Sequence, residues 1–456
     1  MPVLTEILEA QRNHLASGAT LPLAARRAAL GRLEYVLAER ETLLLDALQA
    51  DLGKSHFEGY ETELGMVYAE LHDAQKHLAR WMRPKTVSTP LAHFPSKSRI
   101  YPEPYGTALI LSPWNYPVQL CLAPLVGALA AGCCAVVKPS NYAPATSAAL
   151  AEVLAEAFPP ERVAVVTGGR AENQSLLEQK FDKIFFTGGV KVGRLVMESA
   201  ARNLTPVTLE LGGKSPCLLD HTANLELAAV RLAWGKTLNS GQTCVAPDYL
   251  LIEQSVRDRF LPLLRDAIVR LYGEAPLRNS QYGRIVNQKH FDRLRGLLEG
   301  ETVYCGGRFD ESARKIEPTV LIDVQPDAPV MQEEIFGPLL PVLTWRSLDE
   351  AIAFVNARPK PLALYLFTED RRTEQTVRER VSFGGGCVND TIVHLANPRL
   401  PFGGVGESGM GSYHGKRSFD EFTHYKSVLK KSTRLDIGLR YPPYNDTKYA
   451  WLRRFF

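Results

Sequence analysis

The stretch TALILSPWNYPVQLCLAPLVGALAAGCCAVVKPS, residues 107–140, places a long uncharged segment between two short apolar runs. The runs 107–111 and 134–137 have the length and aliphatic content of buried strands, and the segment 117–131 is long enough for a buried helix. Strand, helix and strand in this order form the repeating unit of a parallel sheet. The stretch therefore predicts an α/β protein.

A membrane span is the alternative interpretation of residues 118–137, because they carry no charge and could cross a bilayer. Pro124 interrupts them, and Ala, Gly and Cys outnumber Leu, which favours a soluble core. The N-terminus, MPVLTEILEAQRN, lacks the basic start and apolar run of a signal peptide. A net charge of +3 gives no electrostatic reason to expect nucleic acid. We therefore expect a cytoplasmic protein without a membrane or nucleic-acid partner.

The same alternation continues outward to about residue 213. Five apolar runs are separated by segments of helical character, and they span 107–111, 135–137, 163–166, 183–186 and 206–211. This order is typical of a doubly wound parallel sheet, whose ligands bind beyond the carboxyl ends of the strands. Polar and glycine residues follow those ends, in the segments 112–115, 138–140, 187–189 and 210–213. The sequence therefore predicts a ligand site along this edge of the sheet.

Further structural parts flank this sheet, since a chain of 456 residues should fold as two or three units. Before residue 84 the periodicity is helical over 23–52 and 61–81, and the Pro-rich stretch 84–104 should leave the main body as a hairpin. After residue 213 a second α/β alternation is expected. Its helices should span 224–238, 255–271 and 287–299, and its strands 249–253 and 363–368.

The cysteine pattern argues against disulfides and metal binding. Seven cysteines is an odd number, most lie in apolar surroundings, and no CxxC or HExxH pattern occurs. We therefore expect free thiols, a reducing compartment and no metal site. Residues 404–409 match G-x-G-x-x-G, but a Pro-containing segment and not a strand precedes them, so we interpret them as a turn-rich loop.

Seven segments occur in order along nearly the whole chain: LSPWNYP (111–117), VKPS (137–140), FFTGGVKVG (185–193), LELGGKSP (209–216), GQTC (241–244), EIFGP (334–338) and PFGGVGESG (401–409). Together they resemble the aldehyde dehydrogenase superfamily, and GQTCVAPDY (241–249) and RYPPY (440–444) are most similar to its class 3 branch. The resemblance implies a homodimer in which each protomer has three parts. These are a Rossmann-like nucleotide-binding domain (1–84 and 104–210), an α/β catalytic domain (211–396), and an oligomerisation element with the C-terminal segment (85–103 and 397–456).

Cys244 ends the polar, Gly-containing segment 239–244 after a predicted helix, so its thiol should be partly accessible. A free thiol has a pKa of about 8.5 and is mostly protonated at neutral pH. An inert buried cysteine is the alternative interpretation. The resemblance assigns this position to the nucleophile, which attacks the aldehyde carbon and then carries the acyl group as a thioester.

Glu210 lies between apolar neighbours, which should raise the pKa of its carboxyl and suit it to proton transfer near neutral pH. By resemblance it activates the water that hydrolyses the thioester. Asn115, at the end of the first strand, offers N–H donors without a charge, and the resemblance places it in the oxyanion hole with the backbone N–H of Cys244. A surface glutamate and a turn asparagine are the alternatives.

The resemblance also implies a site for NAD or NADP, formed by Trp114, Lys138, Thr187, Gly188, Gly193, Glu334 and Phe336. Lys138 would bond the adenosine ribose, the two glycines would let a helix start approach the pyrophosphate, and Glu334 and Phe336 would hold the nicotinamide ribose and ring. Many relatives have Glu directly after Lys-Pro-Ser, where this chain has Asn141. A neutral amide does not repel a 2′-phosphate, so we predict that NADP is accepted.

The function implied is the NAD(P)-dependent oxidation of a small-molecule aldehyde to a carboxylic acid. By analogy, residues near Tyr60, Met66, Tyr116 and 391–394 should line the substrate pocket and favour an apolar aromatic or medium-chain aliphatic aldehyde. The alternatives are a CoA-acylating relative, a γ-glutamyl phosphate reductase-like enzyme and a non-catalytic protein with this fold. Retention of Glu210 argues against the first, because hydrolysis needs a base for water.

Overall fold

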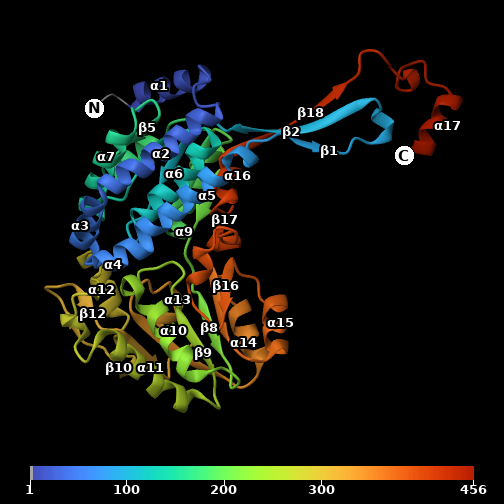
Figure 1. Cartoon of the computed structure of the whole chain (residues 1–456). Helices are drawn as coiled ribbons and strands as arrows, with labels where there is room; N and C mark the ends of the chain where they lie inside the picture. The colour runs from blue at the N-terminus through green and yellow to red at the C-terminus, as the bar shows by residue number, and fades with distance from the viewer. Residues whose placement is uncertain (1–3, 456) are drawn as a thin grey trace.

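The computed structural model describes residues 4–455, and its first sheet has six strands in the order β17-β7-β6-β3-β4-β5 (Figure 1). Five strands are parallel and correspond to the predicted apolar runs: β3 (Thr107–Leu111), β4 (Cys134–Lys138), β5 (Val163–Val165), β6 (Lys183–Thr187) and β7 (Val207–Glu210). The edge strand β17 (Gly409–Met410) pairs with β7 in the antiparallel sense. The α/β fold with a Rossmann-like parallel sheet is thus confirmed.

Helices cover both faces of this sheet, because successive strand residues point to opposite sides. Along β3, Ala108 and Ile110 belong to the core that contains α6 (Gln119–Ala131) and α7 (Pro144–Ala157). Leu109 and Leu111 belong to a second core with α1 (Leu4–Ala16), α8 (Arg170–Leu177) and α9 (Val190–Ala201). Burial on both faces explains why the strands read as continuous apolar runs.

The uncharged segment 118–137 forms α6 and β4, as predicted, and every residue of both elements is buried. Among the helices that the structure describes, none has the length and apolar character needed to cross a membrane.

The N-terminal helices form a further layer on α6 and α7, made of α2 (Leu23–Glu39), α3 (Glu41–Leu52) and α5 (Gly65–Trp81). The stretch 23–52, predicted as helical, is divided at Arg40. After the short α4 (His56–Gly59), the segment that leads into α5 makes a π-helical turn at Tyr60–Leu64, which contacts α6. Such turns are rare and often occur at functional sites.

The second sheet has seven strands in the order β10-β13-β14-β9-β8-β15-β16. Their bounds are β8 (Pro216–Leu219), β9 (Tyr249–Glu253), β10 (Thr302–Cys305), β13 (Thr319–Ile322), β14 (Leu339–Trp345), β15 (Ala363–Phe367) and β16 (Gly385–Val388). The helices are α10 (Leu225–Thr237), α11 (Arg257–Tyr272), α12 (Gln288–Gly296), α13 (Pro329–Gln332), α14 (Leu348–Asn356) and α15 (Arg371–Arg380), and β11 (Phe309–Asp310) pairs with β12 (Lys315–Ile316) outside the sheet. The expected strands 249–253 and 363–368 are confirmed, and the helix expected over 287–299 ends at Gly296.

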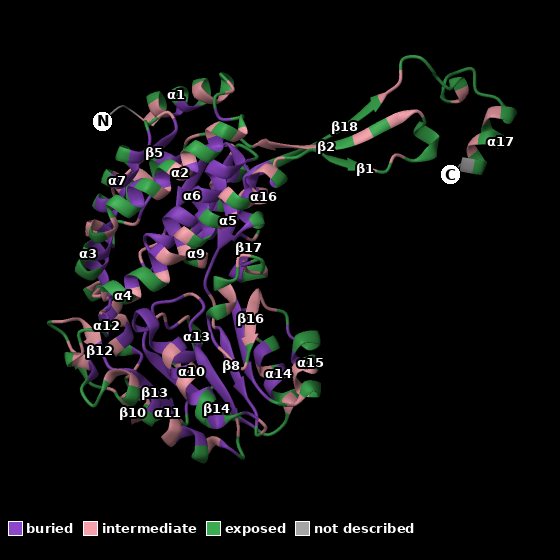
Figure 2. Ribbon diagram, viewed as in Figure 1, coloured by how far each residue is buried: buried purple, intermediate pink, exposed green. Residues whose placement is uncertain are grey.

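A three-stranded antiparallel arm projects from the body, formed by β1 (Lys85–Val87), β2 (Ser96–Pro104) and β18 (Thr423–Lys431) (Figure 1). The predicted hairpin is therefore present and pairs with the C-terminal segment. Most of the arm and the final helix α17 (Asp446–Phe455) is exposed or intermediate (Figure 2). Within the segment 397–456, β17 joins the first sheet and α16 (Lys416–Glu421) packs on α6, so residues 409–421 lie on the body, whereas β18 belongs to the arm.

Candidate active site

The loop that carries Cys244 follows α10 and a short 3₁₀ turn, Leu238–Gly241. Asn239 and Ser240 have φ values of 51° and 53°, in the left-handed region that side chains other than glycine rarely adopt. Gly241 follows with φ 74°, and a Cβ there would lie 2.2 Å from the carbonyl oxygen of Gly337. This unusual backbone brings the half-buried Cys244 to the junction of two cavities.

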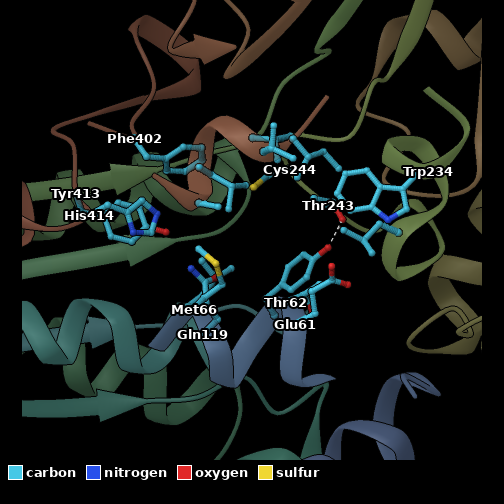
Figure 3. Close-up of a pocket in the computed structure, with 18 residues that line it drawn as sticks. Glu61, Thr62, Met66, Gln119, Trp234, Thr243, Cys244, Phe402, Tyr413 and His414 are labelled. Carbon is cyan, nitrogen blue, oxygen red and sulfur yellow. Dashed lines mark hydrogen bonds between the residues drawn. The ribbon is translucent and has the colours of Figure 1, made fainter. Parts of the chain in front are cut away.

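The first of these, the apolar cavity, lies between the Cys244 loop and the N-terminal helices (Figure 3). The expected lining by residues near Tyr60, namely Glu61 and Thr62, and by Met66, Tyr116 and residues 392–393 is confirmed, whereas Tyr60 itself, Thr391 and His394 do not line the cavity. Further lining residues, absent from the sequence prediction, are Trp234, Leu238, Phe402, Tyr413 and His414. Those residues come from three distant stretches, and no local motif marks them as neighbours.

The second, the polar cavity, brings the predicted chemical groups together. Asn115, Glu210 and Cys244 all line it, together with residues from the ends of β3, β6 and β7. These three side chains therefore share one cavity. The amide Nδ2 of Asn115 donates to the carbonyl oxygen of Gln242 at 3.0 Å, which ties the strand end to the Cys244 loop.

Glu210 is 2% exposed at the end of β7. Among residues 4–455, neither of its carboxylate oxygens has a hydrogen-bond partner. Burial, and secondarily the charge of Glu421, raises the pKa of Glu210 well above its usual value. A buried carboxyl without partners is a costly arrangement, so it points to a role in proton transfer.

The pKa of the Cys244 thiol is also raised, mainly by burial and then by the charges of Glu334 and Glu210. The backbone N–H groups of Cys244 and Val245 act in the opposite direction, because they stabilise negative charge near the sulfur. The raised pKa favours the protonated thiol, so formation of the thiolate needs a base.

Five of the seven residues predicted for the cofactor line the polar cavity: Trp114, Thr187, Gly188, Glu334 and Phe336. Lys138 and Gly193 do not. The Nζ of Lys138 donates to the carbonyl oxygen of Pro139 at 2.9 Å, and Gly193 lies inside α9, where a Cβ would be 2.6 Å from Cδ2 of Leu211. His290 and Arg293 of α12 also line the cavity and were not predicted.

The residues present fit a dinucleotide. The helix α9 begins at the cavity after Gly189, with no side-chain cap and no described heavy atom within 4 Å of a Cβ at that glycine, which leaves room for a pyrophosphate. The buried hydroxyl of Thr187 lacks a partner among the described residues. The carboxylate of Glu334 lies against Gly212, where a Cβ would meet its Oε2 at 2.0 Å. A Cβ at Gly212 would therefore displace Glu334.

The family model for the aldehyde dehydrogenase family matches residues 4–428. The chain belongs to the aldehyde dehydrogenase family. It is 49% identical over 439 residues to a 4,4'-diaponeurosporen-aldehyde dehydrogenase from Staphylococcus aureus, covering 96% of this chain and 95% of that protein. It is 48% identical to human aldehyde dehydrogenase family 3 member B1, covering 99% and 97%.

Among solved structures, the substrate-bound state of Staphylococcus aureus AldH superposes with a TM-score of 0.98 at 47% identity, over 100% of both chains. The resemblance to class 3 aldehyde dehydrogenases is confirmed, and the enzyme is an aldehyde dehydrogenase. A more distant solved member, 28% identical, is in complex with NAD⁺. The family and this solved member together indicate a nicotinamide cofactor for the chain.

Proposed function

We propose that this aldehyde dehydrogenase converts an apolar aldehyde to its carboxylic acid by covalent catalysis at Cys244. The observation that carries the proposal is that Cys244 lines both cavities. An aldehyde in the apolar cavity would meet the sulfur from one side and the cofactor in the polar cavity from the other. No other cysteine among the described residues lines either cavity.

In the first half of the reaction, the Cys244 sulfur bonds to the carbonyl carbon and its proton passes to a base, for which Glu210 is the candidate. Negative charge moves to the substrate oxygen, where the Asn115 amide and the backbone N–H of Cys244 would stabilise it. Trp114, Thr187, Glu334 and Phe336 would hold the nicotinamide cofactor, which when bound accepts the hydride.

Departure of the hydride from the substrate carbon leaves a thioester, and Glu210 releases the thiol proton to solvent. In the second half, Glu210 takes a proton from water as the water oxygen bonds to the thioester carbon. The carbon–sulfur bond then breaks, the acid leaves, and Glu210 returns its proton to the sulfur and restores the thiol. The raised pKa of Glu210 supports this role, since a base with a pKa nearer neutrality can both accept and release a proton during turnover.

The apolar lining supports an aromatic or medium-chain aliphatic substrate, and the name of the Staphylococcus aureus relative, which acts on a diaponeurosporen aldehyde, supports an apolar one. We further propose that NAD and NADP are both used and that the chain forms a homodimer through its arm. Seven unpaired thiols support a cytoplasmic location.

Replacement of Cys244 by Ala tests the proposal. We expect no aldehyde-dependent NAD(P)H formation from the purified variant, and acid release without CoA from the native enzyme. If the variant kept its activity, the mechanism would be wrong. If acid appeared only as a CoA ester, the CoA-acylating alternative would replace hydrolysis.

A further inference from the structure

An ion pair between Lys54 and Glu63 is completely buried near the start of α6. Both side chains are 0% exposed, and Nζ of Lys54 lies 2.6 Å from Oε1 of Glu63. Lys54 follows α3, and Glu63 lies in the π-helical turn before α5. The burial of two charges is costly even when they are paired, so the pair needs a reason beyond stability. Neither residue belongs to a motif used above.

The pair contacts the chain at the end of β3. The second carboxylate oxygen of Glu63 accepts the backbone N–H groups of Val118 and Gln119 at 2.8 and 3.0 Å, where α6 begins. The ammonium of Lys54 donates to the carbonyl oxygen of Asn115 at 3.0 Å and lies 3.9 Å from the centre of the Tyr116 ring. The two charges therefore fix the whole turn from residue 115 to residue 119.

The turn at residues 115–119 also contacts the Cys244 loop, at three positions. The carbonyl oxygen of Asn115 accepts Nδ2 of Asn239 at 2.8 Å, and the side chain of Asn115 donates to Gln242. The hydroxyl of Tyr116 lies 2.6 Å from Oγ1 of Thr243, the contact drawn as a dashed line in Figure 3. Residues 239, 242 and 243 thus all depend on the turn, directly before the nucleophile.

We propose that Lys54 and Glu63 are positioning residues that assemble the oxyanion site and the Cys244 loop before the aldehyde enters. This inference rests on the proposed function of Cys244 and Asn115. The left-handed conformations of Asn239 and Ser240 need external contacts to persist, and the turn supplies them. Lys54 acts through Asn115 and Tyr116, because its ammonium contacts them and lines neither cavity.

The test uses Lys54→Met and the double variant Lys54→Met/Glu63→Gln, which removes both charges and so avoids an unpaired buried carboxylate. Each variant is saturated with NAD⁺ and then mixed with aldehyde at a lower concentration than the enzyme. NADH formation is followed through a single turnover. We expect the rate constant to fall about 10²-fold, the effect of a displacement of about 1 Å at a reacting centre. The dissociation constant for NAD⁺ should change less than threefold, since neither Lys54 nor Glu63 lines the polar cavity.

Arg26→Met is the matched control. Arg26 is a buried cation that donates to the carbonyl oxygen of Ala130 at the far end of α6. The substitution Arg26→Met should lower the melting temperature but leave the single-turnover rate constant unchanged. A merely structural role for the ion pair would lower the melting temperature, as in Arg26→Met, and leave the single-turnover rate constant unchanged.

A rate constant within threefold of the native value in either folded variant would overturn the proposal. That result is distinct from failure of the proposed function, in which the native enzyme itself would form no NADH or would keep its activity after Cys244→Ala.

Discussion

At the scale of single residues, Glu210 and Cys244 present the same chemical problem. Burial raises the pKa of both groups, so the carboxyl and the thiol each favour the protonated form. The reaction needs both to lose a proton. The rate of turnover should therefore rise with pH through the raised pKa of Glu210, and a bound substrate or cofactor has to favour the charged forms.

Glu210→Gln should slow both halves of the reaction and the second half most. We expect a burst of NADH of up to one equivalent that forms more slowly than in the native enzyme, because the thiol has lost its candidate base, and a steady-state rate that falls about 10²–10⁴-fold, because the thioester has no base to activate water. Stopped-flow absorbance at the NADH band measures both phases. A steady-state rate within tenfold of the native one would contradict the role of Glu210.

The same substitution should stabilise the fold at pH 8. The pKa of Glu210 in the folded protein lies above its unfolded value, so the folded state binds more protons and its stability falls as pH rises between the two values. Removal of the carboxyl removes this loss, so the variant should melt at a higher temperature than the native enzyme at pH 8. Melting temperatures of both proteins at pH 8 and near pH 4 measure it, and the advantage of the variant should shrink at the lower pH.

Asn141 should set the cofactor preference. This residue is exposed after the end of β4, and a neutral amide there would accept a 2′-phosphate. We expect the kcat/KM values for NAD and NADP to differ by less than about a hundredfold, roughly 2.7 kcal/mol. Asn141→Glu should shift the ratio toward NAD, and Asn141→Gln, which stays neutral, should not. If the native enzyme preferred NAD by more than a hundredfold, a group other than Asn141 would have to discriminate against the 2′-phosphate.

At the scale of elements, one buried pair holds the segment that carries Glu334 and Phe336. The Nζ of Lys214 bonds to Oδ2 of Asp248 and donates to the carbonyl oxygens of Val330 and Glu333 at 2.9 Å. The other oxygen of Asp248 accepts the N–H of Ile335 at 2.9 Å. The turn after β7 and the loop before β14 are therefore joined, and both contribute residues to the polar cavity.

Asp248→Asn should weaken cofactor binding, because it removes the charge that holds Lys214 and loosens the segment 333–336. We expect the dissociation constant for NADH to rise about tenfold, about 1.4 kcal/mol, as measured by fluorescence titration. The pKa of Glu334, raised to about 8 by burial and by Asp248, should also fall. Glu253→Gln, which breaks a surface pair with His221, is the control. Unchanged affinity together with lower stability would show that Asp248 only supports the fold.

At the scale of the whole molecule, the arm is the part that the body leaves uncovered (Figure 2). Large apolar side chains are exposed on it, including Leu91, Phe94, Val428 and Leu429. Two antiparallel pairings connect its strands, so the arm is ordered by its own backbone and offers its faces to another molecule.

Negative charges introduced on the arm should dissociate the proposed dimer into monomers. Val428→Glu/Leu429→Glu is expected to halve the mass measured by sedimentation velocity, because two carboxylates would lose water in the interface. Val303→Glu, on β10 of the body and similarly exposed, is the control and should not change the mass. A native enzyme that sediments as a monomer would contradict the dimer itself.

The sequence determined the parallel strands of the first sheet and the groups at their ends. Strands buried on both faces leave continuous apolar runs, and this signal is local, so β3, β4 and β6 were predictable within a residue or two. The segments around Cys244, Glu210 and Asn115 were also recognisable, because each is a short contiguous motif.

The tertiary structure alone decided how those motifs meet and what supports them. The division of the N-terminal helix at Arg40, the π-helical turn that carries Glu63, and the contribution of His414 to the apolar cavity leave no local pattern in the sequence. Each depends on contacts between residues far apart in the chain. Lys54 lies 61 positions before Asn115, and as a single lysine among charged and polar neighbours it reads as a solvated side chain. Its burial follows only when the helices pack, since packing removes water from both charges and leaves them each other as partners.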